Sequence, residues 1–151
     1  MFFDKHSDNL KIKYKLRESC QECAPKSAHD GEWYDLSTSE DIRLFENDFA
    51  YIDLGICIAL PEGYEAILAP RSSTFKKYGI LQTNGIGVID ERYCGNNDWW
   101  KMPAYSTRNV SIPKGTRIAQ FRIQPVQPKA ELIEVLEMES EDRGGLGSTG
   151  N

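Results

Sequence analysis

The segment "FAYIDLGICIALPEGYEAILAP", residues 49–70, decides the fold class of this chain. Apolar residues alternate with others through residues 49–60, and a similar pattern returns in residues 64–70. Pro61 and Gly63 stand two residues apart between these runs, which suits a type I turn with proline second and glycine fourth. Alternation bounded by turn residues is typical of β-strands, so the segment predicts strands joined by a tight turn.

The same pattern recurs on both sides of this segment. Strands are expected over 11–16, 105–112, 116–126 and 130–137, and 33–45 predicts a strand, a turn and a second strand. A second Pro-Lys-Gly turn occupies residues 113–115. Many short strands separated by turns predict an all-β sandwich, jelly roll or barrel, and the pattern alone does not choose among the three.

One short helix is expected, over residues 71–79. Ser72 or Ser73 can cap its start, and Gly79 can end it. Together with Arg71, its free backbone N–H groups and hydroxyl groups make a plausible phosphate site. The alternative is a capped surface turn with Arg71 in an ordinary ion pair.

Length and charge limit the possible functions. A chain of 151 residues suits one domain with a single core, and its net charge of −5 argues against a broad nucleic-acid surface without excluding a small phosphate ligand. The first residues carry charges at positions 4 and 5 and lack the apolar core of a signal peptide. No apolar run reaches the length of a membrane span. We therefore expect a cytoplasmic protein without nucleic-acid or membrane partners.

Cys20 and Cys23 form a C-x-x-C pair, which suggests half of a zinc site or a redox pair. Cys57 and Cys94 stand alone, and the two histidines of the chain supply no second ligand pair at the right spacing. We therefore expect Cys20 and Cys23 to be reduced thiols in a loop.

Two further stretches hold residues suited to chemistry. In "NGIGVIDERYCG", residues 84–95, Asp90 has the pattern of a buried acid, and Tyr93 follows three residues later among several glycines. Asp90 can serve as a general base or can cap a turn, whereas a strand tyrosine is more often core packing. The terminus "EDRGGLGSTGN", residues 141–151, is either a disordered tail or a mobile flap that closes on a phosphate.

Four stretches, in order, resemble the motifs of the trimeric dUTPase family: "PRSST" (70–74), "NGIGVIDERYCG" (84–95), "GTRIAQF" (115–121) and "RGGLGSTG" (143–150). A fifth, "WYDL" (33–36), resembles the first motif of that family in a weaker form. The short tail pattern resembles a subgroup found in some bacteria and their phages.

The resemblance implies a jelly-roll-like β domain over residues 1–140 and a flexible motif over 141–151 that closes over the substrate. It further implies a homotrimer whose active sites lie between subunits. The implied reaction is the Mg²⁺-dependent hydrolysis of dUTP to dUMP and pyrophosphate.

Roles for individual residues follow from the same resemblance. Asp90 would activate the attacking water, and the Tyr93 ring would pack against the deoxyribose and exclude a 2′-hydroxyl. Asp35 would act on the Mg²⁺ shell through water or orient Arg71. The remaining expected substrate contacts are Asn84, Gly87 and Ile89 for the uracil, Arg71, Ser72, Ser73 and Gln120 for the phosphates, and Arg143, Leu146, Gly147, Ser148 and Thr149 in the closing tail.

The tail departs from the commoner family pattern, because Leu146 stands where a phenylalanine normally stacks on uracil. We hypothesise that Trp99 or Trp100 supplies the aromatic surface instead; the alternative is that both pack in the core or a subunit interface. Two other functions stay open. One is a dCTP deaminase, which shares the fold and an R-S-S motif, and the other is a dUTPase-like regulator that binds a partner through residues 1–32 or surface loops.

Overall fold

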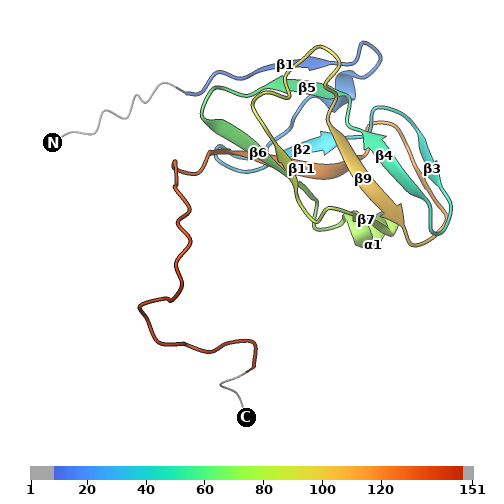
Figure 1. The fold of residues 1–151 in the computed structure, drawn as a ribbon. Helices are drawn as coiled ribbons and strands as arrows, with labels where there is room; N and C mark the ends of the chain where they lie inside the picture. Colours follow the sequence, from blue (N-terminus) through green and yellow to red (C-terminus); the bar gives the residue numbers. More distant parts are fainter. Residues whose placement is uncertain (1–8, 148–151) are drawn as a thin grey trace.

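The computed structural model describes residues 9–147 and is almost entirely β. Figure 1 shows the strands gathered into one body, with a single short α-helix on one side. In chain order the elements are β1 (Lys13–Leu16), the 3₁₀ turn η1 (Gln21–Cys23), β2 (Tyr34–Ser37), β3 (Ile42–Leu44), β4 (Phe49–Asp53), β5 (Ile56–Ala59), β6 (Tyr64–Pro70), α1 (Thr74–Tyr78), β7 (Ile80–Gln82), β8 (Gly87–Ile89), β9 (Lys101–Ser106), β10 (Val110–Ile112) and β11 (Arg117–Pro125).

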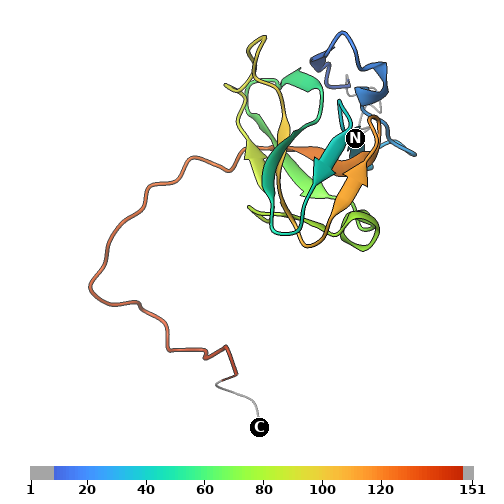
Figure 2. The same cartoon turned by 90° about the vertical axis from the view of Figure 1, so that its right-hand side faces the viewer.

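The strands form four antiparallel groups. The largest has the order β2-β11-β6-β8, and the others are β4-β9-β7, β1-β5 and β10-β3. Its longest ladder joins β6 to β11, from Ala119 opposite Pro70 to Pro125 opposite Tyr64. Neighbours in these groups come from distant parts of the sequence, as a jelly roll requires, and Figure 2 shows the groups closing around a common interior.

Trp100 is the largest side chain of the core. It is 1% exposed and meets the Phe121 ring edge-on, with the ring centroids 5.2 Å apart. The other fully buried large side chains come from both sides of the body: Leu36, Ile52, Leu54, Ile56, Leu68, Ile80, Met102, Ile112 and Ile118. At 1% exposed, Trp100 offers almost no ring surface for stacking in this chain, so Trp99 is the stronger candidate for that role.

The predicted strands over 11–16, 33–45, 64–70 and 116–126 are confirmed with small shifts at their ends. Two predicted strands are each divided in two. The run 49–60 becomes β4 and β5, because Gly55 turns the chain with φ +68°, where a Cβ would lie 2.5 Å from Cys23 Sγ. The run 105–112 likewise contains the end of β9 and the whole of β10.

The predicted strand at 130–137 is wrong: the structure describes all eight residues and gives none of them a strand. After β11 the chain leaves the body, and we call residues 126–147 the C-terminal arm (Figure 1). Leu132 and Leu136 are 96% and 102% exposed, so the alternation seen in the sequence has nothing to pack against within one chain. The predicted division at residue 140 stays a prediction.

The expectation for the C-x-x-C pair is also wrong. Cys20 and Cys23 are joined by a disulfide and are fully buried. Both sulfur atoms lie against the main chain at the end of β2, with Cys20 Sγ 3.8 Å and Cys23 Sγ 3.7 Å from the Thr38 carbonyl oxygen. The pair therefore anchors η1 to β2 and is not a set of free loop thiols.

Arg17 and Asp53 fasten the N-terminal strand to the body. Arg17 Nε donates to Asp53 Oδ1 at 3.0 Å and its Nη2 to Oδ2 at 2.6 Å, while Ser39 Oγ and the Gly55 N–H both donate to Oδ1 at 2.7 Å. Burial alone would raise the pKa of Asp53, but these hydrogen bonds outweigh it and lower the pKa. The carboxylate therefore stays ionised at neutral pH and holds Arg17 in one place.

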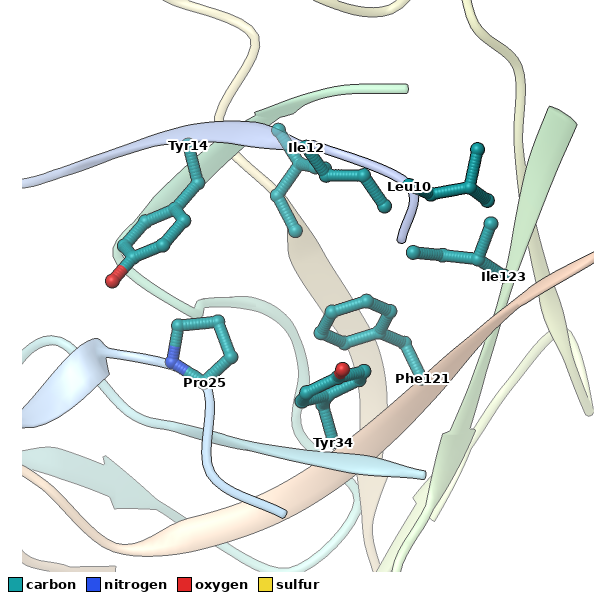
Figure 3. A pocket seen from close by; sticks show the side chains of 8 residues that line it. Leu10, Ile12, Tyr14, Pro25, Tyr34, Phe121 and Ile123 are labelled. Atoms are coloured by element: carbon teal, nitrogen blue, oxygen red, sulfur yellow. The ribbon is translucent and has the colours of Figure 1, made fainter. Parts of the chain in front are cut away.

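An apolar pocket of about 250 Å³ opens beside β1 (Figure 3). Tyr34 and Phe121 stack at its floor with ring centroids 5.3 Å apart. Leu10, Ile12 and Ile123 complete one side of it. In the described part of the chain, no helix has the length and apolar character needed to cross a membrane.

Candidate functional site

A cavity of about 500 Å³ lies where β8 meets the segment that follows it. Five residues singled out from the sequence line this one cavity: Asn84, Gly87, Ile89, Asp90 and Tyr93. They are joined there by Tyr51, Lys101 and Pro103 from the neighbouring sheet and by Trp99 and Trp100, which directly precede β9. The structure therefore brings the central predicted site together, while the role of each residue stays a prediction.

The strands that flank the start of this segment, β7 and β8, do not pair with each other. β7 pairs with β9 and β8 pairs with β6, so the turn between β7 and β8 crosses from one sheet to another. Gly85 makes this turn with φ +69°. Gln82 fastens it, because its Nε2 donates to the Leu68 carbonyl oxygen at 3.1 Å. The cavity therefore opens at a seam between two sheets.

Gly87 lets β8 approach β6 closely. It lies opposite Leu68, and a Cβ on Gly87 would stand 3.2 Å from the Leu68 Cβ and 3.7 Å from the Asn84 side-chain nitrogen. A larger residue would have to displace that wall of the cavity. The main chain from 85 to 87 is thereby free to face a flat ligand through its peptide groups.

Asp90 is half-exposed, with 54% of its side chain accessible, and is not the buried acid that the sequence pattern suggested. Arg92 holds it from two sides: Nε donates to Oδ1 at 3.0 Å and Nη2 to Oδ2 at 3.1 Å. The Arg92 backbone N–H also donates to Oδ1, at 2.7 Å. The side-chain bonds, and then the backbone bond, lower the pKa of Asp90, so it is a carboxylate at neutral pH.

Tyr93 closes the turn after Asp90 and reaches across to the next strand. Its N–H donates to the Asp90 carbonyl oxygen at 3.0 Å, and its hydroxyl donates to the Trp99 carbonyl oxygen at 3.1 Å. Burial raises the pKa of Tyr93, which keeps the phenol protonated as this donor. The Tyr93 ring therefore stands on the cavity wall and is not part of the core.

A second cluster of predicted residues lies where β6, β11 and β2 run side by side. Gln120 lies opposite Asp35 on one side and Ala69 on the other, and its Nε2 donates to the Pro70 carbonyl oxygen at 3.0 Å. Asp35 Oδ1 pairs with Arg71 Nε at 3.2 Å. Of the two roles expected for Asp35, the structure thus contains the contact that orients Arg71.

Sequence reasoning missed Arg117, which also pairs with Asp35, with Nη1 3.4 Å from Oδ2. The sequence did contain a sign of this role, because Arg117 stands in the motif-like stretch "GTRIAQF" and precedes the buried Ile118 in β11, so that its side chain faces the opposite side of the strand. One carboxylate therefore holds two guanidinium groups together near the start of the 71–74 turn.

The helix begins later than predicted, at Thr74, and its start is fastened differently. Ser73 stands at the cap position without a side-chain capping bond. The fully buried Thr74 hydroxyl instead accepts from the Arg71 N–H at 3.1 Å and donates to the Ile118 carbonyl oxygen at 2.7 Å. Gly79 ends the helix as predicted, with φ +65°. The 71–73 turn, with Ser72 exposed, is thus bonded both to the first residue of α1 and to β11.

The described part of the tail lies apart from both clusters in this single chain. Arg143 Nε donates to the Gly144 carbonyl oxygen at 3.4 Å, Leu146 is fully exposed, and Gly147 has φ +85°. Ser148 and Thr149 lie outside the described residues. The predicted tail contacts therefore stay a prediction.

Within residues 9–147, no three His, Cys, Asp or Glu side chains gather as metal ligands. Asp35 already holds two guanidinium groups, so its oxygen atoms suit orientation of Arg71 and Arg117 better than direct metal coordination. Mg²⁺ commonly keeps several waters and binds through substrate phosphates, which is compatible with this donor set.

The chain belongs to the dUTPase family, whose profile matches residues 20–150. It is 48% identical over 141 residues to the SPbeta prophage-derived deoxyuridine 5'-triphosphate nucleotidohydrolase YosS of Bacillus subtilis (strain 168), covering 93% of this chain and 99% of that protein. Two solved structures share the fold.

One is the Staphylococcus bacteriophage 80alpha dUTPase with dUPNHPP, at a TM-score of 0.77 and 23% identity, covering 95% of this chain and 100% of that one. The other is a dUTPase variant from phage phi11 of S. aureus, described with a structural Mg(II) ion, at a TM-score of 0.70 and 21% identity, covering 87% and 100%. At these identities the two structures show the common fold, a jelly-roll-like β body with one short helix.

Arg92→Gln tests the electrostatic environment of Asp90. The substitution removes the two guanidinium bonds and leaves the backbone one, so the pKa of Asp90 should rise toward its ordinary value. A carboxyl ¹³C NMR titration of both proteins measures this, with Arg122→Gln, over the Trp33 ring, as the matched control. An Asp90 pKa equal in Arg92→Gln and the unsubstituted protein would contradict the assignment.

Proposed function

We propose that this chain hydrolyses dUTP to dUMP and pyrophosphate, with Asp90 activating the water that attacks the α-phosphorus. The observation that carries the proposal is the cavity of about 500 Å³ that Asn84, Gly87, Ile89, Asp90 and Tyr93 line together. The family match over residues 20–150 and the nucleotidohydrolase name of the 48% identical B. subtilis protein support it.

Asp90 has the state that a general base needs. Its carboxylate is half-exposed at the cavity and ionised at neutral pH, so water can reach it and lose a proton to it. Arg92 fixes the carboxylate through both oxygens, which orients it before substrate arrives. A positioned base of this kind typically contributes about 10²–10⁴-fold in rate.

The cavity wall suits a pyrimidine deoxynucleoside. The glycine-rich main chain from 84 to 89 would read the uracil edge, because cytosine presents a donor where uracil presents an acceptor, and hydrogen-bond mismatches of that kind discriminate strongly. The hydroxyl of Tyr93 donates to the Trp99 carbonyl oxygen, which fixes the orientation of the ring. The ring would pack against the sugar and leave no space for a 2′-hydroxyl.

The second cluster would hold the phosphate chain. Arg71 and the exposed Ser72 offer a guanidinium group and a hydroxyl, Ser73 follows in the same turn, and Gln120 lies beside Pro70 for the α-phosphate region. Arg143, Leu146, Gly147, Ser148 and Thr149 of the tail would close over the bound nucleotide. Mg²⁺ bound to the phosphates would neutralise their charge, and Asp35 would contact this ion only through a water molecule.

We further propose that the active form is a homotrimer. Three apolar regions within residues 9–147 lack cover in the single chain. On the outer face of β4-β9-β7, Phe49 and Tyr51 are 52% and 67% exposed, and Tyr105 lies between Phe49 and Leu81. The C-terminal arm exposes Leu132, Ile133 and Leu136, and the pocket of Figure 3 offers apolar walls. Exposed apolar surface of this extent marks contact with other chains.

Pyrophosphate release from dUTP, dCTP, dTTP and UTP in the presence of Mg²⁺ tests the proposed reaction. We expect release from dUTP alone, and Asp90→Asn should reduce kcat by at least about 10²-fold while the protein stays folded. Glu91→Gln, the adjacent acid whose Oε2 accepts from the Gly63 N–H, is the matched control and should keep most activity. Ammonia from dCTP would indicate a deaminase, and no turnover of any nucleotide would indicate a binding or regulatory protein.

Trp99→Ala tests whether this residue stacks on the uracil in place of the missing tail phenylalanine. Stacking of a base on an aromatic ring is worth roughly 1–3 kcal/mol, so KM for dUTP should rise at least about fivefold. Trp99→Phe keeps an aromatic face and should retain most of the affinity. Unchanged KM and kcat in Trp99→Ala would exclude the stacking role.

Analytical ultracentrifugation tests the assembly. We expect a mass of about three times 17.2 kDa for the full chain, and a shift toward smaller species in Leu136→Asp, because a charge there prevents burial of the arm. Leu136→Met, which keeps an apolar side chain, is the control. A single 17.2 kDa species for the full chain would contradict the trimer, and an unaltered assembly in Leu136→Asp would contradict the role of the arm.

A further inference from the structure

We propose that Lys15 of β1 and Arg17, the residue directly after β1, are positioning residues for sugar selection, because they hold Trp99 and, through its main chain, the hydroxyl of Tyr93. The inference rests on the role proposed above for Tyr93. It assigns a specificity function to β1, an element that contributes no side chain to the cavity of about 500 Å³.

The first link is a pair of cations on one indole. Arg17 Cζ lies 4.2 Å and Lys15 Nζ 4.8 Å from the centroid of the Trp99 ring. Lys15 therefore approaches the ring from β1 and Arg17 from the residue that follows this strand. Cations at these distances are attracted to the ring face, which restrains the Trp99 ring next to the cavity that it lines.

The second link fixes the cations themselves. Asp53 binds the Arg17 guanidinium through both oxygens and is in turn held by Ser39 and the Gly55 N–H. Lys15 Nζ donates to the Asn96 carbonyl oxygen at 2.5 Å. β1 itself is paired with β5, with Lys15 opposite Cys57. Lys15 and Arg17, which we call the clamp on Trp99, therefore belong to a segment that is anchored at several points.

The third link leads to the substrate wall. The Trp99 carbonyl oxygen accepts the Tyr93 hydroxyl at 3.1 Å. On the other side, the Trp100 N–H donates to Ile56 at 2.8 Å, so the peptide after Trp99 is fastened to β5. The intervening residues 94–97 are exposed, and the Lys15 contact with Asn96 is one of the bonds that hold them to the body. The cations therefore restrain the Trp99 ring, and the bond of the next residue to β5 restrains the Trp99 carbonyl group.

Selection against a ribonucleotide needs a Tyr93 ring that does not yield. A 2′-hydroxyl adds one oxygen to the sugar, and a small outward rotation of the ring would make space for it. A bond from the Tyr93 hydroxyl to a restrained carbonyl opposes that rotation, and weakening the restraint makes it easier. Loss of Lys15 should therefore raise the ratio of kcat/KM for UTP to that for dUTP above its value in the unsubstituted protein.

A different explanation exists for charged residues on β1. Lysines on an edge strand discourage pairing with other chains, whatever lies beside them. Lys13 is exposed on the same side, two residues before Lys15, and would serve that purpose equally well. The two explanations thus differ in whether Lys13 and Lys15 are equivalent.

Lys15→Met is the decisive variant, because Arg17 also serves the Asp53 cluster and its loss could unfold β1. We expect the ratio of kcat/KM for UTP to that for dUTP to rise roughly two- to fivefold, the size of one cation–π contact. The melting temperature should stay that of the unsubstituted protein. Lys13→Met, the matched control, should leave the ratio unchanged; an equal change in Lys13→Met and Lys15→Met, or none in Lys15→Met, overturns the inference.

A double-mutant cycle with Tyr93→Phe separates this inference from the function on which it rests. Tyr93→Phe removes the bond to Trp99, so adding Lys15→Met to it should not alter the ratio further. Additive effects would overturn the route through the hydroxyl. If Tyr93→Ala leaves the UTP-to-dUTP ratio unchanged, the sugar role of Tyr93 fails; if it raises the ratio and Lys15→Met does not, only the clamp fails.

Discussion

The ladder between β6 and β11 is the constraint on which the site depends. It runs from Ala119 opposite Pro70 to Pro125 opposite Tyr64 and places β11 between β6 and β2. Gln120 consequently lies between Asp35 and Ala69, and the chain leaves β6 directly into the turn that carries Arg71. The same strand β6 pairs on its other edge with β8, so Leu68 faces Gly87. A shift of one residue in this ladder would turn Gln120 toward the opposite face.

The two proposed halves of the site meet different physical requirements. The phosphate half uses charge at a place where strands hold the backbone still, and Asp35 keeps Arg71 and Arg117 together before any ligand binds. The nucleoside half uses a chain that crosses from one sheet to another, where Gly85 and Gly87 permit a turn and a close approach. Fixed guanidinium groups suit a triphosphate, and exposed peptide groups beside glycines suit hydrogen bonds to a planar base, so the two halves could bind one nucleotide together.

The strands and the helix end were predictable because they depend on local signals. Alternation gave β6 and β11, and Gly79 marked the end of α1. What depends on distant partners was not predictable. The alternation of residues 130–137 finds no strand partner within the described residues, and the burial of the Cys20–Cys23 disulfide beneath Thr38 depends on a segment 15 or more positions away.

The same limit applies to the site. The motif-like stretches named the residues around the cavity, since each motif lies within a few positions. They did not reveal that Arg92 holds Asp90, that Thr74 and not a serine fastens the phosphate turn, or that Arg17 reaches Trp99 from 82 positions away. The contact of Arg17 with Trp99 arises from the fold and leaves no spacing in the sequence, whereas the contacts of Arg92 and Thr74 depend on the conformation of their own turns.

The central claim is that water activated by Asp90 attacks the α-phosphorus of dUTP. Hydrolysis in H₂¹⁸O followed by mass spectrometry of both products tests it most directly, because the attacked phosphorus keeps the oxygen of the water. We expect one ¹⁸O atom in dUMP and none in pyrophosphate. An ¹⁸O atom in pyrophosphate, with unlabelled dUMP, would mean attack on the β-phosphorus and would contradict the geometry proposed for Asp90 and Gln120.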